Sequence, residues 1–316
     1  MDSNITFPVY SDVSVNTKTF IATLNMRINL VRLYDILEVV PYAIPPAGGR
    51  PAIVSPDSPF GGAIISVKLE TGTTKERKGV FLRRKGKVVK PFRNSVAMDI
   101  FICPDRKLNI KLSANGGLQL TGSRTAADCV CCIEHVFRKI APFVNDAYTM
   151  DEGQAEPLLH IVSVMRNINF SVGVKIDREK LAGRLQHHPQ YMCLFAPQFC
   201  YAGLNAKIKI PPSSRSIHEY TLNREGMSWS FNRRVPLQDF IDYQRQLKGP
   251  GGSKKLLNDA AITFLVFQSG KIIMSGPNSK SMRGHYAEFM RLLSDEYEWI
   301  VERIHTSSFG KTKAKV

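Results

Sequence analysis

One short pattern that occurs twice constrains this chain more than any other feature. It runs Leu-Asn-Ile-Lys-Leu-Ser-Ala-Asn-Gly-Gly-Leu-Gln-Leu-Thr-Gly at 108–122 and Ile-Thr-Phe-Leu-Val-Phe-Gln-Ser-Gly-Lys-Ile-Ile-Met-Ser-Gly at 262–276. Each copy alternates apolar and polar residues on both sides of a tight turn, at Asn115-Gly116 and at Ser269-Gly270. Such turns between alternating runs predict a β-hairpin. Its recurrence predicts a duplicated unit.

The repetition extends upstream of the hairpins. Residues 20–30 match 160–170, and residues 60–69 match 201–210. These ordered matches predict two repeats, at 14–142 and 157–305. The first carries an insertion at about 70–107, the second carries one at about 211–258, and a basic tail follows at 306–316.

Both repeats have the same predicted order of elements: strand, helix, strands, hairpin, helix. The final helices, expected at 124–140 and 279–304, carry apolar residues at spacings of three and four. Neighbouring strands in such an order are antiparallel, which indicates an α+β fold with helices on one face of a single curved sheet. The other face is then left for solvent or a ligand, and we expect the function there.

The charge of the chain favours a polyanionic partner. The 316 residues include 43 Lys and Arg against 27 Asp and Glu, a formal net charge of +16. Part of this excess is clustered between Lys75 and Arg93 and includes Arg83, Arg84 and Lys85. Nucleic acid is a common partner of proteins with such a balance. We therefore expect this segment to be exposed and to contact phosphate.

The sequence shows no motif of a zinc site, a membrane span or a secretory signal. The six cysteines show neither the paired spacing nor the histidine partners of a zinc site, so we expect small buried thiols and no metal. No apolar run reaches the length of about 18 residues that a membrane span requires, and the N-terminus does not resemble a secretory signal. We expect an intracellular protein that is not an enzyme, has no cofactor and does not bind membranes.

The second hairpin is the most specific segment. Leu265-Val-Phe-Gln-Ser-Gly-Lys-Ile-Ile-Met-Ser-Gly276, with the order of elements, resembles the TATA-box-binding protein family, and in particular the divergent members found in large cytoplasmic DNA viruses. This resemblance implies a saddle-shaped sheet with helices on its convex face. It also implies that the concave face lies in the DNA minor groove, where phenylalanines wedge between base pairs.

The resemblance also implies site residues. In the second repeat, Phe267 and Tyr201 match the wedges, while Val162, Ile273 and Ser275 match the floor of the site. In the first repeat, Ser113 stands where a wedge belongs and Gln119 where an apolar floor residue belongs. Phe60 fits the other wedge by the internal match, although Phe92 takes that place if the strand at 95–102 is the partner of the hairpin. The remaining implied DNA contacts are Ile21, Thr121 and Lys271, with Thr19 and His160 at the centre.

The sequence therefore predicts a monomeric transcription initiation factor with internal pseudo-twofold symmetry. Its partners would be double-stranded DNA and RNA polymerase or other initiation factors, in the nucleus or in a viral factory or virion. The alternative is a structural or scaffold protein that keeps this fold, packages nucleic acid or bridges polymerase subunits, and has lost recognition of the groove. The missing first-repeat phenylalanine and the long insertions favour the alternative.

Overall fold

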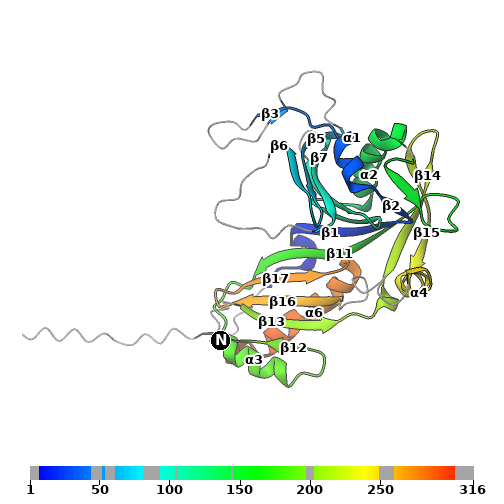
Figure 1. The fold of residues 1–316 in the computed structure, drawn as a ribbon. Coiled ribbons are helices and arrows are strands. Elements are labelled where there is room, and N and C mark those ends of the chain that lie inside the picture. Colours follow the sequence, from blue (N-terminus) through cyan, green and yellow to red (C-terminus); the bar gives the residue numbers. More distant parts are fainter. Residues whose placement is uncertain are drawn as a thin grey trace, which may run out of the picture. The chain divides into compact units, whose positions relative to one another are not determined.

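The structure, a computed structural model, describes residues 7–43, 52–53, 61–80, 93–103, 106–143, 145–196, 203–248 and 260–302. By its internal contacts the chain divides into two compact units (Figure 1). The larger unit consists of Val15–Asn167 and Ile210–Ala260. The smaller unit consists of Met1–Ser14, Ile168–Lys209 and Ala261–Val316. The chain therefore leaves the smaller unit after Lys209, contributes a segment to the larger unit, and returns at Ala261.

An antiparallel sheet forms the centre of the larger unit. Its strand order is β15-β14-β11-β1-β9-β8-β7-β5-β6, and β11 belongs to this unit as far as Asn167. The bounds are β1 (Val15–Leu24), β5 (Ala63–Glu70), β6 (Lys75–Gly79), β7 (Ser95–Cys103), β8 (Arg106–Ser113), β9 (Gly117–Thr121), β11 (Leu158–Ser171), β14 (Ser216–Asn223) and β15 (Ser228–Pro236). Two short pairs accompany it, β2 (Met26–Ile28) with β10 (Tyr148–Met150) and β3 (Tyr42–Ala43) with β4 (Ala52–Ile53).

The first hairpin is β8 and β9, and its turn requires glycine. Gly116 has φ +76°, and a Cβ there would lie 2.4 Å from the carbonyl oxygen of Met26. The turn of the second hairpin, formed by β16 (Ala261–Phe267) and β17 (Lys271–Gly276), is built in the same way. Gly270 has φ +77°, and a Cβ there would lie 2.0 Å from the carbonyl oxygen of Val174. Both turns thus exclude side chains by backbone conformation and by close contact.

Two helices, α1 (Leu30–Ile36) and α2 (Ala126–Ile140), belong to the core of the larger unit. Helix α2 begins with a capping box, in which the Thr125 hydroxyl accepts from the Asp128 N–H and the Asp128 carboxylate accepts from the Thr125 N–H. The core side chains of the hairpin and of α2 include Leu108, Ile110, Leu112, Leu118, Leu120, Ile133, Val136, Phe137 and Ile140. The alternation of the hairpin therefore places one set of its side chains in this core.

The smaller unit repeats the hairpin and helix, and its strands lie in the order β12-β13-β16-β17. Its further elements are α3 (Arg178–Gln186), β12 (Met192–Leu194), β13 (Gly203–Lys209), α6 (Ser279–Asp295) and α7 (Tyr297–Ile300). The fully buried Phe264 of β16 stacks on Phe289 of α6, with 4.0 Å between the ring centroids. Figure 1 shows α6 behind β13 and β16.

The segment that the second repeat inserts into the larger unit is regular structure. It consists of β14, β15 and α4 (Leu237–Lys248), and we call it the inserted module. Strand β14 pairs with β11 from Leu158↔Thr221 to Ile161↔His218. Trp229 of β15 packs edge-on against Phe137 of α2, with 5.4 Å between the ring centroids. The inserted module is thus built into the core of the larger unit.

The structure confirms the α+β class and both hairpins. It shortens the second long helix, because α6 ends at Asp295 and a separate helical turn, α7, follows from Tyr297. It also corrects the expectation that helices cover only one face of the sheet, as the next section describes for α4. In the described part of the chain, no helix is both long and apolar enough to cross a membrane.

Candidate nucleic-acid interface

Alternation along β13, β16 and β17 leaves a set of side chains on the face opposite α6, which we call the smaller-unit face. Ile262, Phe264 and Val266 are fully buried on the α6 side of β16. The side chains between them point the other way and are half-buried. The smaller-unit face carries Asn205, Lys207, Lys209, Thr263, Leu265, Phe267, Lys271, Ile273 and Ser275.

These side chains form rows across the strands. Ile273, Leu265 and Asn205 lie side by side, and Leu194 of β12, 63% exposed, continues the row beyond Asn205. The next row consists of Ser275, Thr263 and Lys207. One row is thus mainly aliphatic, while the other has two hydroxyls and a cation.

Phe267 stands directly opposite Gly203. A Cβ at Gly203 would lie 2.5 Å from Cδ1 of Leu265, so the absence of a side chain there lets Leu265 lie over the β13 backbone. Phe267 and Leu265 therefore adjoin a gap in the row of side chains on β13. The other predicted wedge of this repeat, Tyr201, lies outside the described residues.

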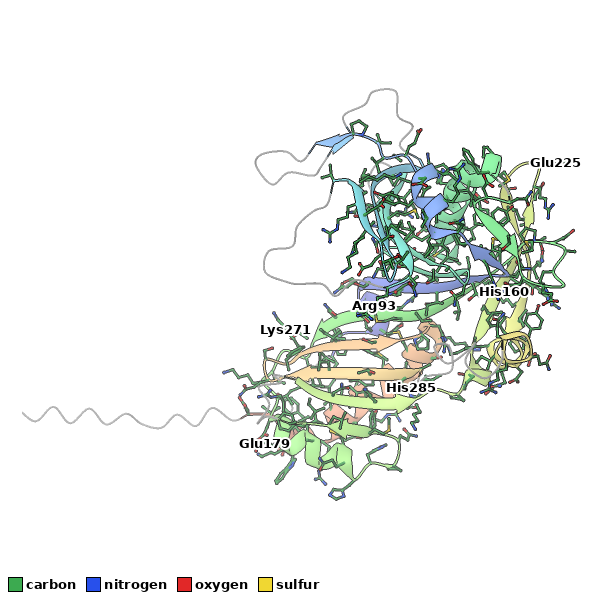
Figure 2. All side chains as sticks on the ribbon, viewed as in Figure 1. Arg93, His160, Glu179, Glu225, Lys271 and His285 are labelled. Atoms are coloured by element: carbon green, nitrogen blue, oxygen red, sulfur yellow. The ribbon has the colours of Figure 1, made fainter. Side chains whose placement is uncertain are left out.

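Polar groups of the smaller-unit face are available to a ligand. Lys209 and Lys271 are exposed, and Figure 2 marks Lys271 at the start of β17. The side-chain oxygen of Asn205 is buried and has no hydrogen-bond partner among the described residues. Because that oxygen is closed to solvent, the two lysines are the groups among these three that a ligand can reach.

The corresponding face of the larger unit, opposite α2, is polar and internally bonded. We call it the larger-unit face. Asp99 of β7 accepts from Nδ2 of Asn109 at 2.8 Å and pairs with Nζ of Lys107 at 3.3 Å. The predicted site residues Ser113, Gln119 and Thr121 are half-buried on this face, and the Thr121 hydroxyl donates to the Asn109 carbonyl at 3.4 Å. No aliphatic row like that of β16 and β17 runs along β8 and β9 at these described positions.

Three predicted contact residues of β1 and β11 contact the inserted module, and a fourth, Thr19, is buried on the same side of β1 as Ile21. Val162 is 3% exposed and packs in a cluster with Leu237, Phe240 and Ile241 of α4. Ile21 packs against the same cluster. Thr19 and His160 are buried as well, with exposed fractions of 6% and 4%. Their predicted role in DNA contact therefore requires that the inserted module moves.

His160 ties β11 to the inserted module. Its Nε2 lies 3.0 Å from a carboxylate oxygen of Glu219 in β14, and the other carboxylate oxygen accepts from Nε of Arg233 at 2.9 Å. The imidazole also lies 4.6 Å from the Phe240 ring, between centroids. Figure 2 marks His160 near α4. Burial lowers the pKa of His160 from its usual 6.5, against the opposing effect of Glu219. A neutral imidazole that donates from Nε2 fits this site.

The basic segment is described only in part. Lys75 and Arg77 of β6 are exposed, as expected. Lys78 instead lies over the Tyr34 ring, 4.5 Å from its centroid, and donates to the Tyr34 carbonyl oxygen. Burial lowers the pKa of Lys78. The three basic residues singled out in the sequence, Arg83, Arg84 and Lys85, lie outside the described residues.

Strand order corrects the internal match of 60–69 with 201–210. Strand β7 is the partner of the first hairpin strand, and β13 is the partner of the second. Strand β5, which follows Phe60, lies one place further out. Strand β7 therefore corresponds to β13, although it falls within the predicted insertion. That is the arrangement under which Phe92, rather than Phe60, takes the wedge position. Both phenylalanines lie outside the described residues.

Of the five described cysteines, two are buried as expected, while Cys103, Cys131 and Cys193 are half-buried. Cys129 and Cys132 are fully buried in α2, and burial raises the pKa of Cys129 to about 12. Cys131 lies with its sulfur 3.5 Å from Nε2 of His135, one turn further along α2. Within the described ranges, no group of three or more His, Cys, Asp or Glu side chains could hold a metal ion.

Sequence reasoning missed the inserted module as a cover. The signal was present, because Leu237, Phe240 and Ile241 are spaced as one apolar face of a helix. Because their partners on β1 and β11 match the DNA contacts that the resemblance implies, the sequence did not indicate that these strands pack against another part of the chain.

An antiparallel sheet that carries two hairpins, each followed by a helix, defines the α+β class of this protein. No family model and no curated protein matches the chain. Among solved structures, "Methanococcus jannaschii TBP" aligns over 91% of this chain and 99% of that chain, with a TM-score of 0.41 and 9% sequence identity. At that score the likeness assigns no function.

Proposed function

We propose that this protein binds double-stranded DNA through the smaller-unit face and acts in transcription initiation. The observation that carries the proposal is the half-buried set Leu265, Phe267 and Ile273, beside the hydroxyls of Thr263 and Ser275. The minor groove of DNA offers few distinguishing hydrogen-bond partners, so apolar and small hydroxyl side chains fit its floor. An aromatic side chain at its edge can wedge between base pairs.

The charges around this face support a polyanion as the ligand. Lys207, Lys209 and Lys271 lie on the same face as Phe267, and the whole chain carries a net charge of +16. Lysines beside an apolar strip can contact phosphates while the strip contacts the groove. Under the same proposal, polymerase or other initiation factors are the protein partners, and the family resemblance of the hairpin extends to the divergent viral members.

The test compares alanine replacement of Phe267, on the smaller-unit face, with alanine replacement of an aromatic residue in the larger unit. Fluorescence anisotropy with AT-rich and GC-rich duplexes would measure binding by the wild type, Phe267→Ala and Phe231→Ala. We expect Phe267→Ala to weaken AT-rich binding roughly tenfold or more, because a duplex that is not kinked by the wedge contacts less of the protein. Phe231 of β15, which is 54% exposed, is the matched control and should leave affinity unchanged. Equal affinity of all three proteins would overturn the proposal.

The second candidate is a scaffold that bridges proteins without reading the groove. The polar, internally bonded larger-unit face favours it, because Asp99 places a carboxylate where a polyanion would lie. The same titration separates the two functions. A scaffold would bind AT-rich and GC-rich duplexes equally weakly, and Phe267→Ala would not alter either affinity.

A further inference from the structure

The inserted module covers a strip of the larger unit that resembles a ligand surface. The strip consists of Ile21 on β1 with Val162 and Val164 on β11, and it packs in one cluster with α4. The apolar side chains of α4 in this cluster, Leu237, Phe240 and Ile241, are at most 2% exposed. The cluster lies on the opposite side of β11 from Leu159 and Ile161, which pack into the main core with α2.

The strip shares its chemistry with the smaller-unit face. Thr19 and Thr23 flank Ile21 on the same side of β1, so the strip combines aliphatic side chains with hydroxyls. The smaller-unit face has the same combination in Ile273, Thr263 and Ser275. A surface with this combination suits the same ligand.

Docking of the inserted module leaves a buried charge poorly compensated. Arg215, at the start of the module, is 7% exposed. Its Nη2 donates to the Ser163 carbonyl at 3.4 Å, and its Nε has no hydrogen-bond partner in the described part of the chain. Burial lowers the pKa of Arg215, and no carboxylate among the described residues opposes that effect. A buried cation without a carboxylate is unfavourable, so it opposes the apolar packing of α4.

Arg215 links two opposing effects, the apolar packing of α4 and the unfavourable burial of the arginine charge. The Leu237 N–H, at the start of α4, donates to the Arg215 carbonyl at 2.9 Å. Movement of α4 away from the strip would therefore release Arg215 into water together with Leu237. Apolar burial favours the covered state, and hydration of Arg215 favours the open one.

We propose that α4 of the inserted module is an internal cover of this strip, which duplex DNA displaces when it binds the larger unit, while β14 and β15 stay in place. The inference rests on the proposed function, since it names a regulation of DNA binding. In the covered state, contact is limited to the smaller-unit face. In the open state, Ile21, Val162 and Val164 become additional groove contacts, and affinity rises.

The test weakens the packing of α4 on the strip. It measures the exposure of the strip and the affinity for DNA separately. The releasing variant is Phe240→Ala with Ile241→Ala, and the control is Tyr243→Ala, which removes a 37% exposed side chain from the same helix. Each is made in the wild-type background and with Val162→Cys, whose reaction with a thiol reagent is followed by peptide mass spectrometry. Affinity for an AT-rich duplex is measured by anisotropy, and circular dichroism checks the fold.

We expect the releasing variant to label at position 162 at least tenfold faster than the control, and to bind DNA roughly three- to tenfold more tightly. Bound duplex should slow the labelling again. Faster labelling with unchanged or weaker DNA binding would overturn the proposal. Unchanged labelling would also overturn it, because α4 would then be a fixed part of the core. If the double variant does not fold, Phe240→Leu gives the same two readouts.

The two proposals fail separately. If Phe267→Ala binds DNA normally while the releasing variant gains affinity, the smaller-unit face is not the ligand surface and the cover stands. If Phe267→Ala loses affinity while release has no effect, only the cover is overturned. If neither protein binds DNA, both proposals are overturned.

Discussion

The faces of the two hairpins differ in chemistry although their other sides are built alike. On the side of the helix, Leu108, Ile110 and Leu112 of β8 are buried as completely as Ile262, Phe264 and Val266 of β16. On the opposite side, β8 carries Asn109, Lys111 and Ser113, where β16 carries Thr263, Leu265 and Phe267. Packing against a helix thus preserves one set of residues, while the other set is free to diverge with function.

The covering of the two faces differs as well. In the larger unit, the inserted module buries Val162 and His160. In the smaller unit, the residues of the hairpin that face away from α6 remain half-buried or exposed. The two faces therefore differ in two ways, by the residues along their own strands and by the segment that packs on one of them.

The largest effect should come from removing the carboxylate that joins the inserted module to β11. Glu219→Ala leaves the His160 N–H without its acceptor in a buried site and removes the partner of Arg233. We expect it to lower the free energy of unfolding of the larger unit by about 2 kcal/mol. Urea unfolding followed by tryptophan fluorescence would measure this in a Trp299→Phe background, where Trp229 is the one tryptophan left. Glu225→Ala, in the exposed turn between β14 and β15, should change little. Equal stability of both variants would contradict the role of this link.

The next effect concerns charge on the smaller-unit face. Replacing Lys207, Lys209 and Lys271 with Gln should weaken DNA binding roughly tenfold and reduce the slope of affinity against salt by about 0.9 per lost phosphate contact. The matched control is to replace three basic residues of α6, Lys280, Arg283 and Arg291, with Gln. Since α6 lies on the opposite side of the sheet, the control should keep the wild-type slope. Identical slopes for both triple variants would show a general charge effect without a preferred face.

A smaller effect concerns how the stability of the larger unit depends on pH. Burial lowers the pKa of His160, so the unfolded chain takes up a proton below about pH 6.5 that the folded unit resists. The pKa of Glu219 is also lowered. Burial raises this pKa, but the hydrogen bonds from Arg233 and His160 together lower it by more. Its stabilising contribution is therefore present above about pH 4.5 and is lost at lower pH.

Both groups make the larger unit less stable in acid. Between pH 7 and pH 5.5 we expect a loss of about 1 kcal/mol from His160. His160→Gln keeps a donor for Glu219 and should remove this part of the pH dependence, which urea unfolding at several pH values would measure. The lowered pKa values of His135 and His218 leave a residual dependence. A His160→Gln variant with the full wild-type dependence would contradict the assignment.

Local patterns in the sequence were enough for the elements that depend on local physics. The turns at Gly116 and Gly270, the alternation of β8 and β16, and the apolar stripe of α2 follow from residues close together in the chain. The half-buried positions of Leu265, Phe267 and Ile273 follow from the same alternation. The end of α6 at Asp295 was missed because the apolar spacing continues through Tyr297 and Ile300, across the break.

Long-range packing could not be predicted in this way. The pairing of β7 with β8 competes with an apparent match between β5 and β13, and only the strand order decides between them. The burial of His160 depends on Glu219 and Phe240, which come from an insertion that the repeat pattern leaves out. The repeat predicts the shared hairpins, and the unshared segment decides which surface is covered.

The central claim is that the smaller-unit face is the main contact surface for DNA, and that DNA meets the larger unit only where α4 is displaced. The most direct measurement is photo-crosslinking to an AT-rich duplex, with p-benzoylphenylalanine in place of Phe267 in one protein and in place of Gln119 in another. The account predicts crosslinks from position 267, reduced by a minor-groove-binding drug, and far fewer from position 119, because its neighbour Ile21 is covered by α4 in the closed state. Crosslinks from position 119 with none from position 267 would contradict it.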